Sequence, residues 1–248
     1  MMRRNEIPTQ EPTPSIGARI SSCDWALVNR ELDSAGCSVL TGLLSSEECT
    51  ALREMYAVDE LFRSRIVMAR HGFGRGEYKY FAYPLPQIVA GLRNALYPRL
   101  ADVANRWNDA LQLDARFPDD HSQFLERCHQ AGQTRPTALL LRYAEGDYNC
   151  LHQDVYGDHV FPLQMTLLLS EPRTDFSGGE FVLTEQRPRM QSRVEVVPLK
   201  LGDAVIFPVR QRPLRGARGV YRVNLRHGVS RIRGGERYTL GLIFHDAT

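Results

Sequence analysis

The sequence lacks the features that mark membrane, secreted and zinc-ribbon proteins. No apolar run among its 248 residues reaches the roughly 18 residues that a transmembrane helix requires. A secretory signal has an apolar segment after its basic residues, and the basic residues at this N-terminus are not followed by one. The five cysteines are an odd number without C-x-x-C spacing, which argues against a disulfide framework or a zinc ribbon. These absences predict a cytoplasmic protein with reduced thiols and no membrane partner.

The chain as a whole also lacks a strong net charge of one sign. Lys and Arg number 31 against 29 Asp and Glu, so the net charge of +2 does not favour nucleic acid as a partner. The segment 187–233 differs, because it holds twelve basic residues and only two acidic ones. Basic loops solvated on one rim explain this excess. The alternative is a positive potential around a cleft that attracts an anionic substrate or cosubstrate.

Apolar spacing divides the chain into a helical part and an extended part. Residues 1–18 are rich in Pro, Thr, Ser and Gln and are predicted to be a disordered tail. Residues 19–132 show helical spacing, and Pro98 should kink or divide the longest helix. Residues 133–248 hold short β-branched runs between turn residues, which is typical of an antiparallel sandwich or barrel. We expect one domain over 19–248, in which the front helices support one sheet.

A glycine-rich segment, residues 71–81, precedes the longest predicted helix. Its glycines resemble a phosphate loop only loosely, because no helix clearly follows at the required spacing. A plain β-hairpin and a mobile loop whose aromatic and basic side chains touch substrate both remain open.

Two side chains of metal-ligand type, His152 and Asp154, form an H-x-D motif. On an extended strand such positions face one side, so both side chains can reach one ion. His227, in a strand-like run 75 residues later, is the best third ligand, ahead of His159 and His245. Two histidines and one carboxylate leave three positions open on a ferrous ion. The alternative is that all three are ordinary polar residues with satisfied hydrogen bonds.

Arg237 follows the third histidine, and Thr239 stands two positions further on the same expected strand face. A guanidinium buried in a barrel needs a planar partner with two oxygen atoms. A dicarboxylate cosubstrate that chelates the metal through its keto-acid end would offer its far carboxylate there. Tyr143 can donate a further hydrogen bond from the preceding strand. The alternative for Arg237 is a surface salt bridge with Glu236.

Several short motifs recur together in a known order. They are R-Y-x-x-G-D-x-x-x-x-H-x-D from Arg142, G-G-E-F from Gly178, G-D-A-V-I-F from Gly202, and then His227, Arg237 and Thr239. Together they resemble the iron(II)/2-oxoglutarate-dependent oxygenases, most closely the prolyl 4-hydroxylase-like branch. The resemblance implies an α+β fold with a double-stranded β-helix core of the jelly-roll, cupin-like kind.

The resemblance also implies roles for the site residues. His152, Asp154 and His227 would bind Fe(II), and Arg237 would hold the C5 carboxylate of 2-oxoglutarate with help from Tyr143 and Thr239. The expected reaction consumes O2, hydroxylates a substrate and releases succinate and carbon dioxide. Ascorbate is a further candidate cofactor.

Two other functions stay open for the same fold. One is oxidative demethylation of a modified base or peptide, and the other is a sensor that binds metal and 2-oxoglutarate without turnover. The residue six positions beyond Arg237 is Ile243, where the nucleic-acid demethylase branch usually has a second arginine. This departure disfavours a nucleic-acid substrate.

Candidate substrate contacts lie near the motif and in the basic segment. Tyr148 and Gln153 flank the metal pair, and Arg187 and Arg189 follow the G-G-E-F strand. An anionic molecule or a peptide would suit such contacts, and surface solvation is the alternative for the two arginines.

Overall fold

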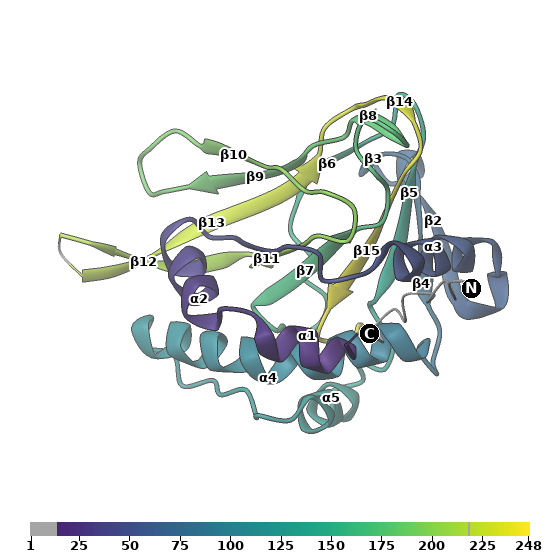
Figure 1. The fold of residues 1–248 in the computed structure, drawn as a ribbon. Coiled ribbons are helices and arrows are strands. Elements are labelled where there is room, and N and C mark those ends of the chain that lie inside the picture. The colour runs from purple at the N-terminus through teal and green to yellow at the C-terminus, as the bar shows by residue number, and fades with distance from the viewer. Residues whose placement is uncertain (1–13, 218) are drawn as a thin grey trace, which may run out of the picture.

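The computed structural model describes residues 14–217 and 219–248, and shows a helical layer packed against two facing β-sheets (Figure 1). Most of the tail predicted over 1–18 lies outside the described residues. Its last part forms a helix, α1 (Ile16–Ser22), so the boundary expected at residue 19 was wrong. Ser15 caps this helix, since its hydroxyl accepts a hydrogen bond from the backbone of Ala18 at 3.3 Å.

The helices of the front part follow their capping and apolar signals. They are α2 (Trp25–Ser34), α3 (Ser46–Glu54), α4 (Gln87–Ala110), α5 (His121–Gln130) and the short η1 (Met55–Ala57), η2 (Asp59–Leu61) and η3 (Met68–Arg70). Ser45 and Glu48 form a reciprocal capping box at the start of α3. Of the two effects predicted for Pro98, a kink or a division of the helix, division is absent, because α4 runs through Pro98 without a break. Pro98 and Asn94 are exposed, so water can hydrate the carbonyl that the proline leaves unbonded.

The larger sheet has seven strands in the order β1-β11-β7-β15-β5-β4-β2. Its strands are β1 (Ser38–Leu40), β2 (Phe62–Val67), β4 (Glu77–Phe81), β5 (Leu139–Tyr143), β7 (Leu163–Leu168), β11 (Ala204–Pro208) and β15 (Arg237–Ile243). Figure 1 shows α1, α2, α4 and α5 gathered on one side of this sheet. The predicted support of one sheet by the front helices is therefore present.

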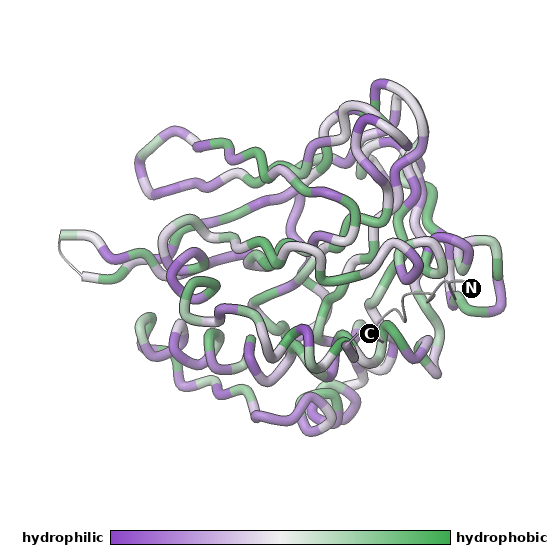
Figure 2. Tube along the Cα trace, in the orientation of Figure 1, coloured by the Kyte–Doolittle hydropathy of each residue, from purple (hydrophilic) through white to green (hydrophobic). Residues whose placement is uncertain are grey.

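The second sheet has six strands in the order β10-β9-β13-β6-β3, with β12 also paired to β13. Its strands are β3 (Gly74–Arg75), β6 (Tyr148–His152), β9 (Phe181–Gln186), β10 (Arg193–Val197), β12 (Gln211–Gly216) and β13 (Gly219–Val229), and a separate pair joins β8 (Phe176–Gly178) to β14 (Ile232–Gly235). The β9–β10 and β12–β13 hairpins extend beyond the body of the molecule (Figure 1). The tip of the β9–β10 hairpin is largely hydrophilic (Figure 2).

Alternation along the strands separates a dry core from a polar interior. On β15, Leu240 and Leu242 pack in the main hydrophobic core with Leu96 and Leu100 of α4. The alternate residues of β15 point to the other side, between the two sheets. The helices therefore cover one face of the larger sheet and leave its other face free to line a cavity. No helix in the described ranges has the length and apolar character needed to cross a membrane.

A buried polar network fastens the C-terminal end to α4 and α5. Asp246 is fully buried and accepts hydrogen bonds from Tyr83 at 2.8 Å, Arg93 at 3.2 Å and His129 at 2.9 Å. Arg93 is only 1% exposed, so its buried positive charge is stabilised by the ion pair with Asp246. A buried cation without its partner is strongly destabilising.

We predict that Asp246→Ala lowers the free energy of unfolding by about 3–5 kcal/mol, because it leaves the Arg93 guanidinium buried and unpaired. Asp109→Ala is the control, since Asp109 pairs with Arg116 on the exposed surface and should change stability by under about 1 kcal/mol. Urea unfolding followed by circular dichroism measures both. Equal small effects would show that the network does not hold the C-terminal end.

Candidate active site

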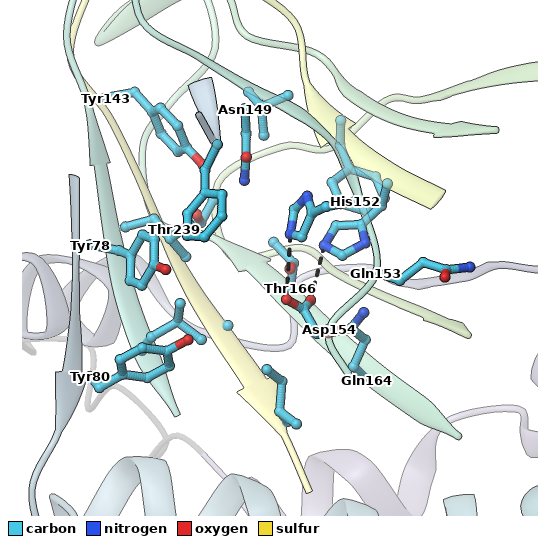
Figure 3. Close-up of a pocket in the computed structure, with 18 of the residues that line it drawn as sticks. Tyr78, Tyr80, Tyr143, Asn149, His152, Gln153, Asp154, Gln164, Thr166 and Thr239 are labelled. Carbon is cyan, nitrogen blue, oxygen red and sulfur yellow. Dashed lines mark ion pairs between the residues drawn. The ribbon is translucent and has the colours of Figure 1, made fainter. Parts of the chain in front are cut away.

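The two histidines of the site are direct neighbours across two strands. His152 ends β6 and His227 lies on β13, and the two residues oppose each other in the antiparallel ladder. Their ring centroids are 4.1 Å apart. Asp154 completes the group: His152 Nε2 lies 3.4 Å from its Oδ1, and His227 Nε2 lies 3.2 Å from its Oδ2. One ligand atom from each residue falls within 4.8 Å of the others, as the predicted triad requires (Figure 3).

A β-bulge on β6 adds a further polar residue to the site. His227 pairs with His152 but Val229 pairs with Asn149, so β6 uses one more residue than β13 over this interval. Asn149 and His152 therefore both line the cavity, although their odd spacing would place them on opposite faces of a regular strand. Gly228 lies at the bulge, where a Cβ would approach the Asn149 carbonyl oxygen to 2.7 Å.

The protonation of the three residues suits a metal site. His152 Nδ1 donates to the Cys150 carbonyl at 2.8 Å, which leaves Nε2 directed at Asp154. Burial alone would raise the pKa of Asp154, but its bonds to His152 and the charge of His227 hold that pKa well below the usual value. Burial and then the neighbouring His152 lower the pKa of His227. Burial opposes protonation of His152 as well, yet the Asp154 bond raises the net pKa of His152. Because Nδ1 of His152 is held by a carbonyl group, Nε2 is the ring nitrogen available to a metal.

The donor set fits ferrous iron by its chemistry. Two imidazole nitrogens and one carboxylate on one side are the ligands that non-haem Fe(II) oxygenases use. Partners outside the ligand set also orient the ligands, because Cys150 fixes the His152 ring and Tyr156 donates to Asp154 Oδ1 at 3.0 Å.

The second part of the site is a buried cation. Arg237 begins β15 opposite Tyr143 of β5, and Arg237 is 1% exposed. Among the described residues, neither Nε nor Nη1 of Arg237 nor the Tyr143 hydroxyl has a hydrogen-bond partner. Glu236 pairs with Arg142, so the structure does not support the alternative of a surface salt bridge between Arg237 and Glu236. Burial lowers the pKa of Arg237 to about 10, which leaves the guanidinium charged at neutral pH.

One cavity of about 200 Å³ joins the two parts. Arg237 and Thr239 both line it, as their two-residue spacing on β15 predicts. An aromatic and aliphatic wall faces the metal ligands; it consists of Phe73, Tyr78, Tyr80, Leu139, Leu141 and Ile243. Figure 3 shows Tyr78 and Tyr80 on the side of the cavity opposite His152 and Asp154. The arrangement suits a molecule with a chelating end and a far carboxylate.

The glycine-rich segment supplies part of this wall. β3 pairs with β6 of the second sheet, and β4 pairs with β5 of the first. The segment is therefore not a phosphate loop. β4 forms an antiparallel hairpin with β2, and the connection between them, which contains β3, reaches the second sheet. Phe73, 47% exposed, lines the cavity from this segment.

Of the four candidate substrate contacts, only Gln153 lines the cavity. Gln153 lines the cavity, but its amide donates to the Leu225 carbonyl at 2.7 Å, and Figure 3 shows it turned away from the ligands. Tyr148 is not among the lining residues, because the bulge turns Asn149 inward instead. Arg187 binds Glu185 at 2.8 Å, and Arg189 is exposed between β9 and β10. The structure thus does not bring Tyr148 or these arginines to the cavity.

The rival ligands and the basic segment lie apart from the metal centre. His159 is exposed, and His245 is buried with Nδ1 accepting from the Phe161 backbone at 3.2 Å. None of the described basic residues between 187 and 233 lines the cavity. One of them, Arg212, is fully buried and paired with Glu185. The basic residues of this segment therefore do not form the lining of the cavity, and a positive potential around it stays a prediction.

Sequence reasoning missed several residues of the cavity: Asn149, Tyr156, Gln164 and Thr166, and the roles of Tyr78 and Tyr80. The alternation Tyr78-Lys79-Tyr80 beside the glycine-rich segment was a usable signal for the last two. Asn149 depends on the bulge, and nothing in the sequence indicates Gln164.

Comparisons with known proteins agree with this geometry. Residues 76–247 match the sequence model of the Oxygenase-NA family, described as an oxygenase catalysing oxidative methylation of damaged DNA. The chain is 51% identical over 167 residues to the uncharacterized proteins MT2286 and Rv2227 of two Mycobacterium tuberculosis strains, covering 67% of this chain and 72% of each relative.

Solved structures show the same fold. An oxidoreductase of the 2OG-Fe(II) oxygenase family from Burkholderia pseudomallei aligns with TM-score 0.53 and 15% identity, over 92% of this chain and 94% of that one. A Pseudomonas putida prolyl-4-hydroxylase aligns with TM-score 0.50 and 16% identity, over 90% of this chain and 99% of that one.

These likenesses confirm the expected α+β double-stranded β-helix. The chain belongs to the Oxygenase-NA family of oxygenases, and it has the fold seen in a 2OG-Fe(II) oxygenase and in a prolyl-4-hydroxylase.

Proposed function

We propose that this protein is an iron(II)- and 2-oxoglutarate-dependent dioxygenase that hydroxylates a carbon of a substrate bound between the metal ligands and the aromatic wall. One observation carries the proposal: the unpartnered guanidinium of Arg237 lies in the same cavity as His152, Asp154 and His227. A buried charge of this kind calls for an anionic ligand. A dicarboxylate that also chelates the metal satisfies both ends of the cavity.

Each residue of the site has a defined task in this reaction. His152, Asp154 and His227 would hold Fe(II) from one side and leave the positions toward the cavity open. When bound, Fe(II) with 2-oxoglutarate and O2 supplies the oxidising power, and succinate and carbon dioxide are released. Arg237, Tyr143 and Thr239 would bind and orient the far carboxylate of the cosubstrate. The aromatic and aliphatic wall keeps water from the reacting atoms.

A second candidate function is oxidative demethylation of a modified base in DNA. The description of the matching family favours it. Ile243 lines the cavity at the position where a second arginine is expected in nucleic-acid demethylases. The absence of that arginine disfavours demethylation of DNA. A peptide, a small anion and damaged DNA are therefore the substrates to compare, with ascorbate added as reductant.

The free state of all five cysteines supports the cytoplasm as the compartment.

Succinate release separates these functions from a sensor without turnover. We expect succinate above background with a true substrate, and formaldehyde as well if the reaction is a demethylation. Binding of 2-oxoglutarate with no succinate formed under any condition would support the sensor instead.

We predict a visible charge-transfer band when ferrous iron and 2-oxoglutarate are added without oxygen, as the family implies for this type of site. His227→Ala should abolish the band, because it removes one of three metal ligands. A difference spectrum measures the change, and His159→Ala, outside the ligand group, should retain the band. A wild-type protein that shows no band would contradict the metal site.

Arg237→Ala should weaken 2-oxoglutarate binding by about 2–5 kcal/mol, the range for loss of one partner in a buried charge pair. Calorimetric titration of the metal-loaded protein measures the affinity. Arg142→Ala is the matched control, since Arg142 sits on β5 and pairs with Glu236 outside the cavity. Similar affinities for both variants would remove Arg237 from the binding site.

A further inference from the structure

A chain of hydroxyl groups leads from the aromatic wall to the metal ligand Asp154. The Tyr80 hydroxyl donates to the Tyr156 oxygen at 3.2 Å, and Tyr156 donates to Asp154 Oδ1 at 3.0 Å. Both tyrosines line the cavity. Tyr80 belongs to β4 of the larger sheet, whereas Asp154 follows β6 of the second sheet. The chain therefore joins the two sides of the cavity through a ligand of the metal.

The segment that carries Tyr156 has no helix or strand, yet a buried amide holds it in place. Gln133 is 0% exposed and donates to the carbonyls of Tyr156 at 3.1 Å and His159 at 3.2 Å. Its amide oxygen accepts from the His159 backbone at 2.7 Å. Gly157 lies against this amide with φ +79°, and a Cβ there would approach Gln133 Cδ to 2.4 Å. Only glycine fits this contact, so the segment is built around Gln133.

Tyr156 is suited to donate rather than to accept from Asp154. An ionised carboxylate can only accept hydrogen bonds, so the phenol is the donor in its contact with Asp154 Oδ1. Its oxygen accepts the bond from Tyr80, which aligns the hydroxyl hydrogen toward Oδ1. Each carboxylate oxygen faces one ligand histidine: Oδ1 lies 3.4 Å from His152 Nε2, and Oδ2 lies 3.2 Å from His227 Nε2. Among the described residues, only Oδ1 also accepts a hydrogen bond from a hydroxyl group.

We propose that Tyr156, supported by Tyr80 and Gln133, is a positioning residue that occupies Oδ1 of Asp154 and presents Oδ2 alone to the metal. A carboxylate held in this way binds through one oxygen atom and leaves the remaining coordination positions open. This proposal rests on the proposed metal site. It assigns to Tyr156 a task other than substrate contact, although Tyr156 also lines the cavity.

The test uses Co(II), whose absorption spectrum reports coordination, in the absence of 2-oxoglutarate and substrate. Tyr156→Phe keeps the ring and removes the donor. Partners of metal ligands typically contribute 10–100-fold to metal affinity, so we expect Co(II) to bind about 10-fold or more weakly. The visible Co(II) spectrum should change as Asp154 becomes free to bind through both oxygens. The melting temperature of the metal-free variant should stay at the wild-type value.

Two further variants separate positioning from a general loss of structure. Tyr80→Phe keeps the bond from Tyr156 to Asp154 and removes its support, so Co(II) affinity should fall by less than in Tyr156→Phe. Tyr148→Phe removes a phenol hydroxyl from β6 outside the cavity and is the matched control, with wild-type affinity and spectrum. If Tyr156→Phe does not fold, the fall in affinity of Tyr80→Phe relative to Tyr148→Phe decides the question.

The outcomes distinguish this proposal from the function on which it rests. A wild-type protein that does not bind Co(II) would overturn the metal site itself. Wild-type binding together with the same affinity and spectrum in Tyr156→Phe would overturn the positioning role alone.

Discussion

The structure depends on the meeting of three ligand atoms at a point where two distant strands lie side by side. His152 and His227 oppose each other directly in one ladder, so backbone hydrogen bonds fix their separation before any metal binds. Asp154, two residues further, has its charge stabilised by both rings. The contacts among these three polar groups thus offset the electrostatic cost of burying them together. The site therefore has its geometry before a metal binds.

The rest of the fold isolates this site and gives it a second anchor. The helices cover one face of the larger sheet, so alternate residues of β15 are divided between a dry core and the cavity. Arg237 lies at the cavity side without a partner in the described part of the chain, which would be unfavourable in a protein that never binds an anion. Metal ligands and guanidinium together define the length and charge of the cosubstrate.

The parts of this site that sequence could predict follow simple periodicity. The H-x-D motif and the pair Arg237 and Thr239 each use the two-residue repeat of a strand, and the structure places both pairs in one cavity. Motif order then indicated His227 and the fold class. Asn149 lay beyond such reasoning, because a bulge changes which side chains face inward. Substrate contact by Arg187 and Arg189, which follow the G-G-E-F motif, stays a prediction: neither lines the cavity, and Arg187 pairs with Glu185.

The most direct measurement is an anaerobic crystal structure with Mn(II) and 2-oxoglutarate. The account predicts one metal ion bound by Nε2 of His152, Nε2 of His227 and a single oxygen of Asp154. It also predicts the far carboxylate of 2-oxoglutarate about 3 Å from the Arg237 guanidinium, the distance of a charge-assisted hydrogen bond. A metal bound elsewhere, or a cosubstrate that leaves Arg237 without a carboxylate, would contradict it.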